Sequence, residues 1–433
     1  MSFWGEEGIT EDVALSVCKY CDVRHPILHL KMGERLDCNQ PQRILIQDGH
    51  VYLTNLISAH YLGHPELSGF LLELYETSHH YRLPDAEFVV WFGEEAPALT
   101  RVTNGKSAWP YHPSGSMPPI LHWSKAEDNG ALLIPSAASF HCAADSYDHF
   151  VHRMKMPNHT EVAWKDKKEI AFGRWNNVCP TYLQTMTTAD GQPMQCPRTH
   201  LPLLSKQHPD LLDAFDLDSA GPLPVMKHQQ YKYLISTDGK SISRKLDKYM
   251  QSGSTVLKAQ SNRKAFYYDA IKPYEHYLPF MVNSSNDIVD VINWAKTHDA
   301  EAQKIAENAR AFANQHLNRH ARHCYLYRLI QEISKKIKYQ ASCKHRRLCV
   351  PLVQELRFLV KFPKTRKTCR WYEIMHHFSH IDHAGKDRHY IYEETERLHD
   401  EGKCWPRDDL HLKKVRVPPP PPPPSPSAMY MHM

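Results

Sequence analysis

The chain has 433 residues and a formal net charge of +5, from 53 Lys and Arg residues against 48 Asp and Glu residues. Hydrophobic residues make up 42% and charged residues 23%, an ordinary globular composition at a length typical of about two to three domains. No apolar run reaches the roughly 18 residues that a membrane-spanning helix needs. The sequence therefore predicts no transmembrane span, and its small charge does not indicate a nucleic-acid surface.

The cysteines leave the cellular compartment open, because their odd number of 11 fits neither a complete disulfide framework nor a typical cytosolic chain. Cys18 and Cys21 have the spacing of a metal or redox pair, but no neighbour completes either site, so a disulfide or free thiols are the readings that remain. Residues 1–17 contain no basic stretch before an apolar one, so no signal peptide is predicted. Sequons at Asn158 and Asn283 are compatible with the secretory pathway.

The first half of the chain reads as mixed strands and helices. Arg43–Ile46 and His50–Leu53 flank an Asp-Gly turn at residues 48–49 and predict a hairpin. Pro65–Tyr75 has helical spacing of apolar residues, and Glu87–Phe92 is a nearly continuous apolar run of the kind that parallel sheets bury. This alternation predicts an α/β fold.

Three helices are predicted in the second half. Pro209–Phe215 is a short one, Asn286–Thr297 has one apolar face, and Asp299–Lys335 continues with apolar residues at helical spacing. We interpret those faces as core. Cys179 and Cys196 flank a polar, turn-rich insertion, which a disulfide between them would close; two unpaired thiols are the equal alternative.

The character of the chain changes after about residue 340. Cys343–Arg370 is rich in Lys, Arg and Cys, and His376, His380 and His383 would share one face of a helix. They could form a zinc site, or be ordinary side chains in a chain with 30 histidines. The run Pro418–Pro424 predicts polyproline II. It is either a stiff solvated tail, a docking arm for an SH3- or WW-like partner, or a target of hydroxyproline-type glycosylation.

The stretch from residue 231 to 280 predicts a strand, a turn, a basic helical segment and a second strand. Such a unit places backbone N–H groups and positive charge beside a ligand phosphate. Its candidate ligand-binding residues are Asp238, Gly239, Ser243, Arg244, Lys245 and Ser254.

Four blocks in chain order, including this stretch, resemble glycosyltransferase family 90, the capsule-associated, Rumi-like O-glucosyltransferases and O-xylosyltransferases. The other three are Leu83–Val90, which resembles the family's "LPD-x-E" strand, Trp164–Arg174, which resembles its "FRG" strand, and Pro197–Ala214, which resembles its "PR…LS…PDLLDA" block. The likeness covers roughly residues 40 to 335.

The resemblance implies a GT-B-like fold, with two Rossmann-like domains facing a cleft, followed by a basic and proline-rich C-terminal tail. The expected divisions are an N-terminal extension (1–39), an acceptor-side domain (40–200), a nucleotide-sugar-binding domain (201–340), a basic extension (341–417) and the proline-rich tail (418–433).

It also implies an inverting transfer of glucose or xylose from a UDP-sugar to a hydroxyl of a protein or polysaccharide, with no cofactor or metal, in the lumen of the endoplasmic reticulum or Golgi. Asp216 and Asp218 have the Asp-x-Asp spacing of manganese-dependent transferases, but a bounding Gly and Pro indicate a turn. The alternative function is a family member without turnover that binds glycans or proteins, with the proline-rich tail as its docking arm.

The carboxylate base of the family aligns best with Glu94, with Glu95 as the second candidate, and a solvated acidic loop is the alternative reading of both. Glu94 stands where the family has Asp, which moves the carboxylate outward by one methylene.

The resemblance assigns Arg198 and Arg174, together with the loop residues above, to the diphosphate; a surface arginine at a helix start is the alternative for Arg198. Three further positions depart from the family pattern, and they are Trp175, Lys245 and Ala265.

Overall fold

The computed structural model describes residues 4, 7–17, 27–29, 35–37, 41–55, 57, 64–96, 116–141, 146–157, 159–346 and 348–361. These lie in one compact unit, residues 1–370, and residues 371–433 form a second. Cys18, Cys21, Asn158, the histidines from His376 to His383 and the Pro418–Pro424 run lie outside the described residues, so those predictions stay predictions. No helix among the described residues has the length and apolarity to cross a bilayer.

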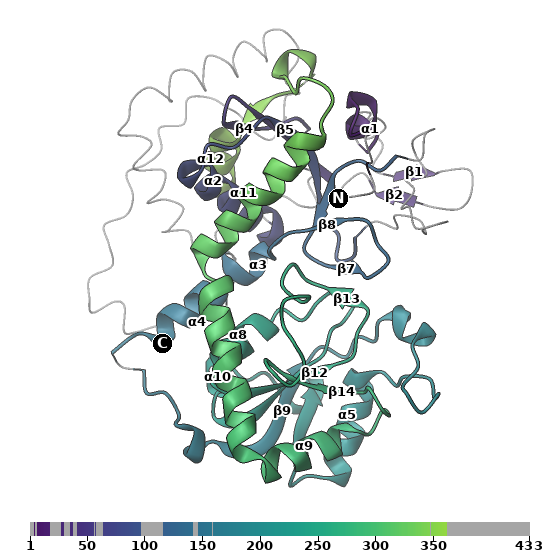
Figure 1. Cartoon of the computed structure of the whole chain (residues 1–433), viewed down its shortest axis with the longest axis vertical. Helices are drawn as coiled ribbons and strands as arrows, with labels where there is room; N and C mark the ends of the chain where they lie inside the picture. The colour runs from purple at the N-terminus through teal and green to yellow at the C-terminus, as the bar shows by residue number, and fades with distance from the viewer. Residues whose placement is uncertain are drawn as a thin grey trace. The chain divides into compact units, whose positions relative to one another are not determined.

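A five-stranded parallel sheet forms the core of the second half, in the order β10-β9-β11-β12-β14. Its strands are β9 (Lys168–Trp175), β10 (Leu212–Asp216), β11 (Tyr231–Ser236), β12 (Thr255–Ala259) and β14 (Leu278–Phe280), all in the teal part of Figure 1. All six residues of β11 are buried, as expected of a central parallel strand.

Helices α5 (Pro197–Gln207), α8 (Leu246–Gln251), α9 (Ile288–Thr297) and α10 (Asp299–His316) pack against this sheet or against each other. The structure confirms the predicted strand, helix and strand between residues 231 and 259, since α8 connects the parallel strands β11 and β12. It also confirms the predicted helix at residues 286–297, whose buried residues are Ile288, Ile292 and Ala295.

The helix predicted at Pro209–Phe215 is wrong, because Leu212–Asp216 is the edge strand β10. Its side chains alternate between buried and half-buried positions, and Leu212 pairs with Ala171 of β9. A short apolar run cannot be assigned to helix or strand by periodicity alone, and the neighbouring strand decides here.

The single helix predicted at Asp299–Lys335 is two helices, α10 and α11 (Arg319–Lys336). Asn318 adopts extended backbone angles, φ −67° and ψ 163°, and its side chain accepts a hydrogen bond from the backbone N–H of Ala321 at 3.0 Å. Asn318 therefore ends one helix and caps the next.

A six-stranded mixed sheet, in the order β15-β4-β3-β5-β6-β8, forms the core of the first half. The predicted hairpin is confirmed as β3 (Pro41–Gln47) and β4 (His50–Leu53), with Asp48 and Gly49 both in the left-handed region at φ 53° and 83°. The fully buried β5 (Ala86–Trp91) pairs antiparallel with β3 and parallel with a later strand.

That later strand is β6 (Ile120–His122), which pairs in turn with β8 (Leu132–Leu133). The predicted helix at Pro65–Tyr75 is confirmed as α2 (Pro65–His80), and it packs beside α11. A separate short ladder of β7 (Lys125–Ala126) and β13 (Arg263–Lys264) joins the two halves (Figure 1).

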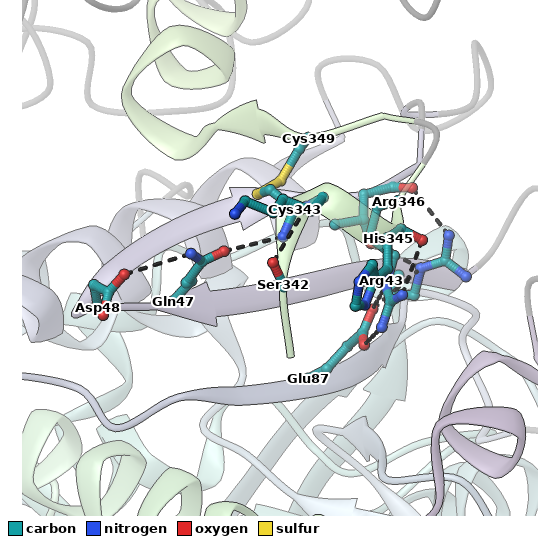
Figure 2. The surroundings of a disulfide bond; sticks show 11 residues. Arg43, Gln47, Asp48, Glu87, Ser342, Cys343, His345, Arg346 and Cys349 are labelled. Atoms are coloured by element: carbon teal, nitrogen blue, oxygen red, sulfur yellow. Dashed lines mark hydrogen bonds and ion pairs between the residues drawn. A yellow bond between two sulfur atoms is a disulfide. The ribbon is translucent and has the colours of Figure 1, made fainter. Parts of the chain in front are cut away.

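The chain returns to the first sheet after α11. Strand β15 (Val350–Pro351) pairs antiparallel with β4, and α12 (Leu352–Lys361) contacts α2 and β4. A disulfide between Cys343 and Cys349, which the sequence did not predict, precedes β15 (Figure 2). Residues 343–361 thus continue the first sheet and its covering helices.

Arg346 anchors this return through a buried carboxylate. Its Nη2 lies 2.5 Å from Oε2 of Glu87 on β5 (Figure 2), and its Nη1 lies 2.7 Å from Oε1 of Glu11. Glu87 is fully buried and also accepts a hydrogen bond from the Tyr339 hydroxyl at 2.9 Å. A buried carboxylate is stable only while such partners are present.

We expect Arg346→Ala to lower the free energy of unfolding by about 3 kcal/mol, because it leaves Glu87 buried with part of its charge uncompensated. Urea unfolding followed by tryptophan fluorescence measures the change. The matched control is Lys344→Ala, an exposed cation two residues earlier, for which we expect less than about 0.5 kcal/mol. Equal changes in the free energy of unfolding of the two variants would contradict the proposed contribution of the Arg346–Glu87 pair.

Candidate active site

Arg198 lies where the parallel strands β9 and β11 end. It is near the start of α5, and its Nη2 and Nε donate to the carbonyl and hydroxyl oxygens of Thr237 at 3.1 and 3.3 Å. Its Nη1 donates to the carbonyl of Asn176 at 3.2 Å. Thr237 follows β11 and Asn176 follows β9, so the guanidinium spans the carboxyl edge of the sheet. Ligands of open α/β sheets bind at this edge.

Gly239 allows the close approach of Arg198. A Cβ atom at this position would lie 2.9 Å from both terminal nitrogens of the guanidinium, nearer than side chains tolerate. A side chain at this position would require the end of the Arg198 side chain to move, so the glycine permits the observed position of the guanidinium.

The buried Asp238 side chain holds the same loop through hydrogen bonds. The carboxylate is buried, and its Oδ1 accepts the backbone N–H of Ser243 at 2.7 Å and the hydroxyl of Tyr268 at 3.0 Å. Lys258 Nζ lies 3.8 Å from its Oδ2. Asp238 thus closes the loop that begins at Gly239 and brings Ser243 to the edge through its backbone.

The structure separates Arg244 and Lys245, which the sequence placed together in the diphosphate site. Lys245 donates to the carbonyl of Arg174, at the end of β9. Arg244 points to the first half, where its Nη2 lies 2.6 Å from Oε1 of Glu66 on α2. Neighbouring residues of a turn leave it in different directions, so Lys245 lies at the carboxyl edge of the sheet and Arg244 spans the two halves.

Arg174 and Ser254 have structural partners. Arg174 Nη2 lies 2.6 Å from Oδ1 of Asp213, which ties β9 to the edge strand. Ser254 is fully buried just before β12, and its hydroxyl donates to the carbonyl of Tyr231 at 2.7 Å. The hydroxyl also accepts a hydrogen bond from Lys167 Nζ at 3.1 Å. Both contacts of Ser254 therefore lie at the amino edge of the sheet, and the structure does not group it with Gly239. A turn that precedes a parallel strand necessarily lies at that opposite edge.

Glu94 and Glu95 follow β5, and the structure gives them different surroundings. Glu95 Oε1 lies 2.5 Å from Nη2 of Arg263, whose guanidinium also stacks on the Tyr182 ring at 4.7 Å. The Glu94 side chain is 61% exposed, and Lys240 Nζ lies 3.9 Å from its Oε2. Both glutamates are exposed, Glu95 by 47%, but Arg263 holds Glu95, whereas Glu94 faces the loop that contains Gly239.

Sequence reasoning missed His122 and Ser124, which support both loops. His122 ends β6, and its Nε2 lies 2.8 Å from the carbonyl oxygen of Gly93. Its Nδ1 contacts both the backbone N–H of Ser124, at 3.0 Å, and the carbonyl oxygen of the same residue. The tautomer with its hydrogen on Nε2 donates to Gly93 and accepts from the Ser124 N–H. Burial lowers the pKa of His122 to about 4, and the ring is neutral at physiological pH.

The Ser124 hydroxyl oxygen in turn accepts the backbone N–H of Ile242, in the loop after β11, at 3.2 Å. One segment at the end of β6 therefore contacts the loop of the candidate base and the loop of the candidate phosphate site. Nothing in the sequence distinguishes His122 from the other histidines of the chain, and only the contact with Gly93 reveals it.

Two of the departures from the family pattern have partners in the structure. Trp175 is buried, and its Nε1 donates to the backbone carbonyl of Arg198 at 3.0 Å. Ala265 is buried ahead of Tyr267 and Tyr268, and the latter is a partner of Asp238. The Trp175 indole therefore contacts the helix start that contains Arg198.

A disulfide links Cys179 to Cys196, with an S–S distance of 2.03 Å, and settles the pairing that the sequence left open. Cys196 caps α5, directly before Pro197 and Arg198. The bond therefore ties the segment after β9 to the helix start that positions Arg198.

Asp216 is the last residue of β10 and Asp218 lies in the short helix that follows it, so the turn predicted for this pair is wrong. Oδ1 of Asp216 accepts the backbone N–H groups of Asp218 and Ser219 at 3.0 and 2.9 Å, and thereby caps the short helix α6 (Leu217–Ala220). The Asp216 carboxylate is used as a helix cap.

Comparison with known proteins identifies the family of the chain. Human protein O-glucosyltransferase 3 is 28% identical over 267 residues, covering 59% of this chain and 48% of the relative. Protein O-glucosyltransferase 2 of Danio rerio is 27% identical over 283 residues, covering 62% and 50%. O-glucosyltransferase rumi of Drosophila pseudoobscura pseudoobscura is 26% identical over 252 residues, covering 53% and 58%. The chain spans about half the length of the curated relatives that it matches.

Among solved structures, Anabaena Alr3699/HepE in complex with UDP is 11% identical with a TM-score of 0.27, covering 50% of this chain and 72% of that one. The family model "Glycosyl transferase family 90" matches residues 30–371. The chain therefore belongs to glycosyltransferase family 90.

Proposed function

We propose that the chain is a UDP-sugar-dependent glycosyltransferase that moves glucose or xylose to a hydroxyl of a protein or polysaccharide. The observation that carries the proposal is the placement of Arg198 at the carboxyl edge of β9 and β11, against Gly239. A guanidinium there offers charge-assisted hydrogen bonds to a diphosphate. The relatives' names, protein O-glucosyltransferase, favour glucose and a protein acceptor.

In the proposed reaction, Glu94 removes the proton of the acceptor hydroxyl while its oxygen attacks the anomeric carbon of the sugar. The bond from that carbon to the UDP oxygen breaks, and UDP leaves with both bonding electrons and inversion at the carbon. Arg198 stabilises the charge on the departing diphosphate. Lys240, near both Glu94 and Gly239, adds positive charge beside the same loop. We propose that the reaction needs no metal ion.

The arrangement that we propose is GT-B-like, with the first sheet on the acceptor side and the second sheet holding the nucleotide. Strand β9 pairs with β10 and β11, so we place the division before Lys168 and not at residue 200. We propose the lumen of the endoplasmic reticulum or Golgi as the compartment, which a disulfide at the donor site supports.

Arg198→Ala should weaken UDP binding by roughly 10- to 150-fold, the range expected when a charged hydrogen-bond donor worth about 1.5–3 kcal/mol is removed. Calorimetric titration of the whole chain with UDP measures it. The control is Lys206→Ala, an exposed cation on the same helix, which should leave the affinity unchanged. A folded parent that binds no UDP would instead favour a family member that binds glycans or proteins without turnover.

Glu94→Gln should lower the rate of sugar transfer by roughly 100- to 10,000-fold, because it removes the base, while UDP affinity stays the same. Glu95→Gln is the control, because Arg263 already holds that carboxylate, and we expect a smaller loss from it. UDP release from UDP-glucose in the presence of an acceptor gives the rates. Undiminished transfer by Glu94→Gln would remove Glu94 from the mechanism.

His122→Phe should lower kcat by about 100-fold with little change in KM for the UDP-sugar, because the Gly93 carbonyl loses its donor and the Glu94 loop shifts by about 1 Å. His122→Gln keeps an N–H donor, and we expect it to restore part of the rate. A general loss of stability would instead change both variants alike and raise KM, so thermal unfolding is measured beside the kinetics.

A further inference from the structure

A buried group of carboxylates and imidazoles lies among the helices, and none of its members belongs to the proposed reaction. Glu73 and Glu76 are one turn apart on α2, His141 follows α3 (Ala137–Phe140), and His323 is on α11. No more than 5% of any of these four side chains is exposed.

The ligand atoms of this group surround a common point. His141 Nε2 contacts Oε2 of Glu73 and lies 3.8 Å from Oε2 of Glu76. His323 Nε2 lies 3.3 Å from Oε2 of Glu76 and 3.8 Å from Oε1 of Glu73. The ligand atoms of Glu73, Glu76 and His141 all lie within 4.8 Å of one another, and His323 adds a second ring nitrogen.

His323 is the observation that points to a missing ligand. The side chain is fully buried, and neither ring nitrogen has a hydrogen-bond partner within the part of the chain that the structure describes. Nδ1 of His141 is likewise buried and has no hydrogen-bond partner among the described residues. Buried polar atoms are nearly always satisfied, and an imidazole nitrogen aimed at two carboxylates is a natural metal ligand.

The charges of the surrounding side chains also favour a bound cation. Three carboxylates, Glu73, Glu76 and Asp148, lie beside two guanidiniums within the part of the chain that the structure describes. Arg322 is fully buried, and Arg319, which is 38% exposed, lies 3.7 Å from Glu76 and 3.2 Å from Asp148. The carboxylates therefore outnumber the guanidiniums by one, and a bound cation would balance that charge in the interior.

We propose that Glu73, Glu76, His141 and His323 bind a divalent transition metal, with Zn²⁺ as the first candidate. Two carboxylate oxygens and two imidazole nitrogens make a closed set of four for a tetrahedral ion, and a site with no open position is structural and not catalytic. Arg322 Nε, 2.8 Å from Oε1 of Glu73, orients that carboxylate as outer-shell partners do.

The ion would connect α2, α11 and the segment after α3. Its role is thus structural, and it stands independently of the proposed transferase activity, because its ligands include neither Arg198 nor Glu94.

The test is zinc content of the whole chain, prepared without a histidine tag, equilibrated with Zn²⁺ and then dialysed against a weak chelator. We expect about one zinc per chain by elemental mass spectrometry. The double variant His141→Gln/His323→Gln should bind at least about tenfold more weakly. The control is His79→Gln/His320→Gln, which removes two exposed imidazoles from the same helices and should retain the zinc.

Replacement by Co²⁺ gives a second readout that does not depend on a variant's folding. Tetrahedral coordination in the parent protein gives intense visible absorption, whereas weak octahedral bands would overturn the proposal. No retained zinc in the parent would also overturn it, and would show that protons on the histidines balance the carboxylates. Zinc lost from the His79/His320 variant, but kept by the His141/His323 variant, would place the ion on the surface.

Discussion

The structure depends on one buried cation, Arg322. Its guanidinium is completely enclosed, with Nε 2.8 Å from Oε1 of Glu73 on α2 and Nη2 2.8 Å from Oδ2 of Asp148 on α4 (Tyr147–Met154). Burial alone would raise the pKa of Glu73, but Arg322 and His141 lower it overall, so this carboxylate is ionised in the interior. If either Arg322 or its carboxylate partners were removed, the remaining group would be a buried charge without compensation.

This constraint explains how the two sheets are held in one unit. Helix α10 packs on β12 of the second sheet, and α11, which contains Arg322, packs on α2 and β5 of the first. The short β7–β13 ladder makes a second connection, and Arg263 of β13 holds Glu95. The loops of the candidate site lie between these connections, and the end of β6 contacts both. A shift of one sheet against the other would therefore move Glu94 relative to Arg198.

Local patterns were sufficient for much of the fold. The Asp48-Gly49 hairpin and α2 are determined by turn chemistry and by the spacing of apolar residues, and both were predicted. The strand β10 was not predicted, because the apolar pattern of its five residues fits a helical turn as well as a strand. The break at Asn318 was missed because the apolar spacing continues across it. Only the extended backbone angles of this one cap residue separate the two helices.

The candidate site divides in the same way. The positions of Gly239 and Arg198 followed from the family blocks, because a strand end and a helix start place them at one edge. The contacts of Arg244 with Glu66 and of His122 with Gly93 join residues far apart in the chain. Such pairs are decided by how the sheets pack, and no spacing in the sequence encodes them.

The Cys179–Cys196 bond makes the candidate site sensitive to where the protein resides. Disulfides persist in oxidising compartments and are reduced in the cytosol. With the bond open, the start of α5 would lose its covalent link to the segment after β9, and the hydrogen bond from Trp175 to the Arg198 carbonyl would remain as a contact between them. The same polypeptide would then present a well-ordered arginine in one compartment and a looser one in the other.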